Sequence, residues 1–111
     1  MNWISLTTPE QVSEIKAKSA TSLQAIFKHS TRCSISSMVL NRLERSDAPA
    51  AIDFYFLDLI AYRSLSNLVA ETFHIHHESP QLLLIKNGEC IYEESHMGIN
   101  MDELSAQLVQ A

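Results

Sequence analysis

Two cysteines are the candidates for nucleophilic chemistry in this sequence, and Cys33 has the more reactive setting. It follows a polar turn and precedes a stretch with helical spacing of apolar residues. A thiol at a helix start faces unpaired backbone N–H groups and the positive end of the helix dipole. Both favour the thiolate, so the pKa of such a cysteine falls below its free value of about 8.5. Since the thiolate is the attacking species in disulfide exchange, the spacing predicts a nucleophile at Cys33.

The neighbours of Cys33 indicate a site with one thiol. Ser36 stands where a Cys-X-X-Cys redox pair would have its second cysteine. A serine there can hydrogen-bond the Cys33 thiolate but cannot resolve a mixed disulfide. Arg32 is next to Cys33 and His29 lies four residues before it, so either could add positive charge.

Cys90 is predicted to be inert. It follows Asn87-Gly88, a strong two-residue hairpin signal. The strand from Pro80 to Gly88 would span roughly 26 Å at about 3.3 Å per residue. A disulfide needs Cα atoms within roughly 7 Å, so Cys90 should behave as a small apolar strand residue.

Three histidines, His74, His76 and His77, raise the question of a metal site with Cys33 as a fourth ligand. Their spacing matches no zinc signature, and a structural zinc site needs four tetrahedral ligands. We therefore expect a solvated histidine loop and no metal.

Length and composition favour one small globular domain over residues 1–111. The chain is 46% hydrophobic and 19% charged, values typical of a folded domain. A net charge of −5 argues against nucleic-acid binding. No apolar run is long enough to cross a bilayer, and the start lacks the pattern of a signal peptide. Two cysteines without a secretion signal favour a cytoplasmic location.

Apolar spacing and turn residues predict alternating strands and helices. Thr8, Pro9 and Gln11 have the spacing of a capping box with proline at the first helical position. This alternation predicts an α/β fold, with a mixed sheet of four to five strands and helices on both faces. The expected strands are 3–6, 23–28, 52–57, 82–85 and 90–94, and the expected helices are 9–18, 34–44, 64–73 and one beginning at Asn100 or Asp102. Core-facing residues are expected to include Ile35, Met38, Val39, Leu43 and Phe73.

Three segments, FKHSTRCSIS, SNLVAETF and HHESPQLLLIKNGECIYEESHMGI, resemble the monothiol bacilliredoxins, thioredoxin-like proteins of the bacillithiol system. The resemblance covers residues 23–99 and implies a thioredoxin-like fold. It implies a cis Ser79–Pro80 bond, with the Ser79 backbone exposed to pair with a substrate chain. His77 and Gly98 would lie beside the site, with His77 giving electrostatic support. The family usually has proline after its reactive cysteine, whereas this chain has Ser34, which can still begin a helix.

The resemblance also implies an activity. Cys33 would attack the mixed disulfide of an S-bacillithiolated client protein and take the bacillithiol, and a second bacillithiol would then release it. This low-molecular-weight thiol is thus a co-substrate, with no tightly bound cofactor. From the residues themselves we expect no nucleic-acid or membrane partner, and a monomer, because no long exposed apolar stripe demands a dimer.

Two alternatives stay open. Monothiol glutaredoxins share iron–sulfur clusters between subunits through a Cys-Gly-Phe-Ser motif of the same spacing, although this chain lacks the glycine. The other alternative is a non-catalytic thioredoxin-like scaffold.

Overall fold

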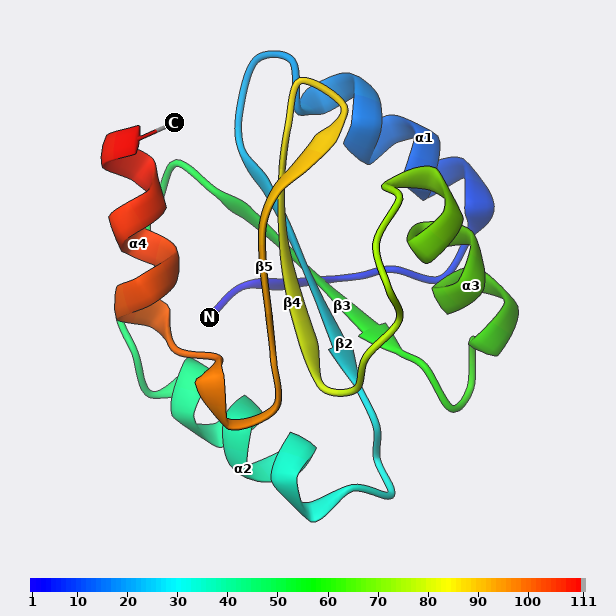
Figure 1. Cartoon of the computed structure of the whole chain (residues 1–111), viewed down its shortest axis with the longest axis vertical. Helices are drawn as coiled ribbons and strands as arrows, with labels where there is room; N and C mark the ends of the chain where they lie inside the picture. The colour runs from blue at the N-terminus through cyan, green and yellow to red at the C-terminus, as the bar shows by residue number, and fades with distance from the viewer. Residues whose placement is uncertain (111) are drawn as a thin grey trace.

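The computed structural model describes residues 1–110 and shows a five-stranded mixed sheet between two pairs of helices (Figure 1). The predicted strands and helices are all present, with bounds within one residue of those expected, and a short 3₁₀ helix, η1, was not predicted. The elements are β1 (Trp3–Ser5), α1 (Pro9–Lys18), β2 (Gln24–His29), α2 (Ser34–Glu44), β3 (Asp53–Asp58), α3 (Arg63–Thr72), β4 (Gln81–Lys86), β5 (Glu89–Ser95), η1 (His96–Gly98) and α4 (Met101–Gln110).

The strand order β1-β3-β2-β4-β5 determines which loops meet. β1, β3 and β2 are parallel, whereas β4 is antiparallel to both β2 and β5. Gln81, the first residue of β4, pairs with Lys28 near the end of β2 and with Ser95 at the end of β5. The ends of β2, β3 and β5 and the start of β4 therefore lie at one end of the sheet, and the β4–β5 hairpin lies at the other.

Each face of the sheet is covered by one helix pair. α1 and α3 pack on one face and α2 and α4 on the other, as Figure 1 shows. The first face buries, among others, Val12, Ile15, Ile26, Leu57, Leu65, Val69, Phe73 and Leu83. The second buries, among others, Ala25, Phe27, Val39, Leu43, Leu82, Leu84, Met101 and Leu104. Both faces of β2 and β4 are thus covered, as the apolar run of β4 predicts.

Two of the expected core residues on α2 are exposed. Val39 and Leu43 are buried, but Ile35 is 39% and Met38 55% exposed. The stripe that α2 buries is instead Ser36, Val39 and Leu43, so Ile35 and Met38 lie on a side of the helix turned away from the sheet. This correction places two exposed apolar side chains on the helix that Cys33 begins.

Local signals set the helix starts. The Thr8 N–H donates to Gln11 Oε1 at 3.1 Å and the Gln11 N–H donates to Thr8 Oγ1 at 3.4 Å, which is the predicted capping box. At α4, the Glu103 N–H donates to Asn100 Oδ1 at 2.8 Å. Within residues 1–110 no helix has the length and apolar character needed to cross a membrane.

Candidate functional site

Cys33 is the N-cap residue of α2, with extended backbone angles (φ −109°, ψ 120°), and it is half-buried. Its N–H donates to the Ser30 carbonyl at 3.2 Å, and its carbonyl accepts from the Ser37 N–H at 3.1 Å. The Cys33 side chain makes no capping hydrogen bond. The first-turn N–H groups of α2 therefore remain available to a negative charge that develops on sulfur.

The turn before β4 lies at the same end of the sheet as Cys33. The Ser79–Pro80 bond is cis, as the resemblance implied. The Pro80 carbonyl accepts from the His96 N–H at 3.0 Å. Within the described chain, neither the N–H nor the C=O of Ser79 makes a hydrogen bond to another backbone group. The Ser79 backbone can thus pair with an incoming extended chain.

Ser36 is turned into the protein and does not make the predicted hydrogen bond to Cys33. It is fully buried, on the inward stripe that continues through Val39 and Leu43. Its Oγ accepts from the Ser30 N–H at 3.0 Å and forms a hydrogen bond of 2.7 Å with His29 Nδ1. Ser36 therefore fastens the turn that carries Cys33.

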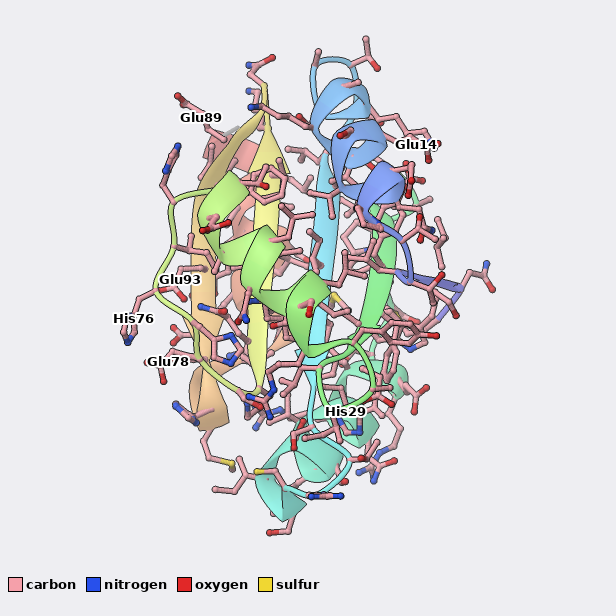
Figure 2. The ribbon with its side chains drawn as sticks, turned by 90° about the vertical axis from the view of Figure 1, so that its right-hand side faces the viewer. Glu14, His29, His76, Glu78, Glu89 and Glu93 are labelled. Carbon is pink, nitrogen blue, oxygen red and sulfur yellow. The ribbon has the colours of Figure 1, made fainter. Side chains whose placement is uncertain are left out.

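His29 does not supply the positive charge considered from the sequence. Burial lowers the pKa of its imidazole, and the opposing effects of Asp58 and Glu44 are smaller. The ring lies against Phe27 and Phe56 at centroid distances of 6.0 and 5.4 Å. At pH 7 His29 is therefore a neutral hydrogen-bond partner at the end of β2, beside the ribbon of α2 in Figure 2.

Replacing Ser36 by alanine should destabilise the protein. The change leaves Ser30 N–H and His29 Nδ1 without this partner in a buried place, which costs about 1–3 kcal/mol. Urea unfolding measures this free energy. Ser34→Ala is the matched control, because Ser34 is exposed and should change stability by less than about 0.5 kcal/mol. Equal stabilities of the two variants would contradict a fastening role for Ser36.

His77 is linked to a buried lysine that the sequence interpretation missed. Its Nδ1 lies 3.1 Å from Lys28 Nζ and 3.4 Å from Ser66 Oγ. Burial, followed by the charges of Lys28 and Arg63, lowers the pKa of His77. His77 is thus a neutral ring held on the α3 side of the sheet. The signal for Lys28 was a lysine directly after the apolar run 25–27 of β2.

Gly98 lies close to the Glu94 side chain, whose flexible end would have to move to make room for a larger residue at this position. It lies in η1, and a Cβ atom built there would be 2.8 Å from Glu94 Cδ. The Arg42 guanidinium, from α2, donates to the carbonyls of Met97 and Ile99 on either side of Gly98. α2 and the η1 segment are therefore joined at the end of the sheet where α2 begins.

Other charged side chains lie near the end of the sheet where α2 begins. Arg32 is exposed. Glu78 contacts two histidines, with Oε2 3.4 Å from His76 Nε2 and Oε1 3.0 Å from His96 Nε2. Figure 2 shows Glu78 beside His76, before β4.

Across residues 1–110, no group of three or more His, Cys, Asp or Glu side chains is arranged to hold a metal ion. Asp58 Oδ1 accepts from the N–H groups of Ile60 and Ala61, a turn-capping role.

Cys90 lies at the opposite, hairpin end of the sheet. It pairs with Ile85, four residues along β4 from Gln81, which corresponds to roughly 13 Å at about 3.3 Å per residue. Burial raises the pKa of its thiol, and Sγ donates to the Tyr92 carbonyl at 3.3 Å. A disulfide with Cys33 is therefore out of reach in this fold.

Cys33 is half-buried and lies outside the two main hollows of the surface. It lines neither of two surface hollows, of about 520 and 410 Å³, at residues 46–54 with the N-terminus and at the start of α3. A partly exposed thiol outside any of these hollows, with an unpaired strand-like segment at the same end of the sheet, suits a disulfide carried by another protein better than a deeply enclosed small molecule.

Comparison with known proteins agrees with this geometry. A family model described as monothiol bacilliredoxin BrxC matches residues 4–104. A solved structure of a candidate oxidoreductase with a thioredoxin fold is 28% identical, with a TM-score of 0.77, and the match covers 93% of this chain and 90% of that one. Malassezia sympodialis thioredoxin (Mala s 13) is 20% identical, with a TM-score of 0.72 and coverage of 98% and 90%. Chlamydomonas reinhardtii thioredoxin f2 is 15% identical, with a TM-score of 0.69 and coverage of 98% and 95%.

Proposed function

Since this chain belongs to the monothiol bacilliredoxin family and has the thioredoxin fold, we propose that it removes bacillithiol from S-bacillithiolated proteins through Cys33. Membership of this family, together with the thioredoxin fold, supports a redox function that uses a single thiol. The proposal adds the identity of the small thiol and the direction of the reaction.

The chemistry is two successive thiol–disulfide exchanges. The Cys33 thiolate attacks the bacillithiol sulfur of the mixed disulfide, a Cys33–bacillithiol bond forms, and the client protein leaves as a thiolate. A second bacillithiol thiolate then attacks the Cys33 adduct, which releases oxidised bacillithiol and restores the Cys33 thiolate. The N–H groups at the start of α2 stabilise this charge on sulfur before and after each exchange.

The isolation of Cys33 is the observation that carries the proposal. The position three residues on holds Ser36, whose hydroxyl is engaged with Ser30 and His29. Cys90 lies at the hairpin end. A thiol without an internal resolving partner suits a reaction in which a small thiol completes the cycle.

Intact-protein mass spectrometry after exposure to oxidised bacillithiol tests the proposal. We expect one bacillithiol adduct per chain, mapped to Cys33 by peptide analysis and removed by added bacillithiol. We also expect release of a client protein from its bacillithiol adduct by catalytic amounts of the reduced enzyme. An adduct on Cys90, or no faster release than with bacillithiol alone, would contradict the proposal. Visible colour and bound iron in the purified protein would instead favour the iron–sulfur alternative.

A further inference from the structure

Lys28 is a fully buried lysine in β2. Within the described residues it forms no ion pair with a carboxylate. Its Nζ donates to the Ser66 carbonyl at 3.1 Å and to His77 Nδ1 at 3.1 Å. Burying an ammonium is unfavourable unless its hydrogen bonds are well made. Burial lowers the pKa of Lys28 to about 8, so the side chain is still mostly charged at pH 7.

The contact with Lys28 determines the state of His77. A protonated lysine has donors and no acceptor, so His77 Nδ1 must accept. The neutral imidazole therefore carries its proton on Nε2. His77 is half-buried and precedes Ser79 by two residues. Lys28 thus links the interior of the sheet to the segment that contains the cis bond.

This segment, residues 76–80, is also held from its other sides. Gln81 Nε2 donates to the His76 carbonyl at 2.9 Å and to Glu93 Oε2 at 3.0 Å. The His96 N–H donates to the Pro80 carbonyl. These contacts come from β4, β5 and η1, whereas the Lys28 ammonium, which donates to the Ser66 backbone carbonyl of α3, holds His77 from β2. The segment is therefore positioned from both sides of the Ser79 backbone.

We propose that Lys28 is a positioning residue of the redox site: its buried ammonium fixes the Nε2–H form of His77 and so holds residues 76–80 in the conformation that pairs with a substrate polypeptide. The inference deepens the proposed function, because that polypeptide is the client protein in the proposed reaction. It requires only that Cys33 exchange with a disulfide on a peptide chain, and does not depend on the identity of the small thiol.

Lys28→Met separates positioning from a purely structural role. Methionine fills a similar space without a charge, and replacing buried charges by apolar residues is often neutral or stabilising. We expect the midpoint of thermal unfolding to stay within about 4 °C of wild type or to rise. We expect exchange with a peptide substrate to slow about tenfold, the size of one misplaced contact in a bound geometry.

The kinetic assay uses two disulfides that differ only in the peptide. One is a peptide whose cysteine is joined to 2-nitro-5-thiobenzoate, and the other is the small symmetrical disulfide of that thiol. In each case the Cys33 thiolate releases one coloured thiolate in a single turnover. Lys28→Met should slow the peptide reaction about tenfold and leave the small-disulfide reaction within about twofold. Equal slowing of both reactions would mean that Lys28 acts on the thiol, and slowing of neither would mean that it has no role; either result overturns the proposal.

A double-mutant cycle with His77→Ala tests the link between the two residues. Because Lys28 acts through His77, the double variant should be no slower on the peptide disulfide than His77→Ala alone. Independent, multiplying effects would overturn the proposal. Ser66→Ala is the matched control, because it removes a hydroxyl 3.4 Å from His77 Nδ1 but keeps the carbonyl that accepts from Lys28. It should react at the wild-type rate within about twofold.

Nitrogen NMR of the histidine rings gives a readout that needs no substrate. In wild type, the neutral His77 ring should show a protonated Nε2 and an unprotonated Nδ1. In Lys28→Met, both neutral forms should be populated. An unchanged His77 signal in the variant would overturn the proposal, even if the protein proved inactive on bacillithiolated clients. Inactivity on those clients together with the expected peptide and NMR results would instead refute only the proposed function.

Discussion

Cys33→Ser should abolish thiol–disulfide exchange, with a loss of the order of 10³-fold or more. A serine hydroxyl is protonated at neutral pH, and the attacking species in the exchange is a thiolate. The position at the start of α2 is retained in the variant, so the loss reports the sulfur itself. The measurement is the rate at which a bacillithiolated client protein regains its free thiol.

Cys90→Ser is the matched control for this prediction. Cys90 is half-buried at the hairpin end of the sheet, and burial raises the pKa of its thiol. We expect its replacement to leave the rate within about twofold, since an inert thiol contributes packing alone. Residual exchange in Cys33→Ser that disappears in the double variant would show that Cys90 reacts, and would refute the single-nucleophile mechanism.

Phe27→Ala should have the largest effect on stability, about 3–5 kcal/mol in the free energy of unfolding. Phe27 is fully buried in β2. Its ring lies 5.8 Å from that of Trp3 and 6.2 Å from that of Phe56, measured between centroids. Truncation removes this packing and leaves a cavity under α2 and α4. Urea unfolding monitored by tryptophan fluorescence gives the change directly, because Trp3 is the sole tryptophan.

Phe27→Leu provides the comparison. Leucine keeps most of the apolar volume, so the cost should be below about 1.5 kcal/mol. The alanine variant should also react more slowly with disulfides, since Phe27 supports His29 in the strand that leads to Cys33. If alanine and leucine cost the same free energy, the ring cluster is not part of the rigid core.

Most of the fold follows from local patterns in the sequence. The buried run at 82–85 and the Asn87-Gly88 hairpin define β4 and β5. The Thr8–Gln11 capping box defines the start of α1. These signals depend on residues close together in the chain, so they can be read without coordinates.

The features that the sequence did not predict correctly depend on packing between elements that are distant in the chain. The spacing of Ile35 and Met38 is that of a buried stripe, but which side of α2 faces the sheet depends on tertiary packing, and the buried stripe is Ser36, Val39 and Leu43. The direction of the Ser36 hydroxyl depends on how closely His29 approaches. Lys28 is buried because Ser66 and His77, far away in the sequence, supply its acceptors.

The two margins of the sheet have a consequence for solubility. β1 has only three residues, and β5 carries exposed glutamates at positions 89 and 93 with a register irregularity opposite Leu84 and Ile85. Short outer strands, acidic side chains and bulges all hinder one molecule from adding its backbone to that of another. Intermolecular β-sheet formation is therefore hindered at both edge strands, β1 and β5. The unpaired backbone at Ser79 is thus left as the place where another chain can pair transiently.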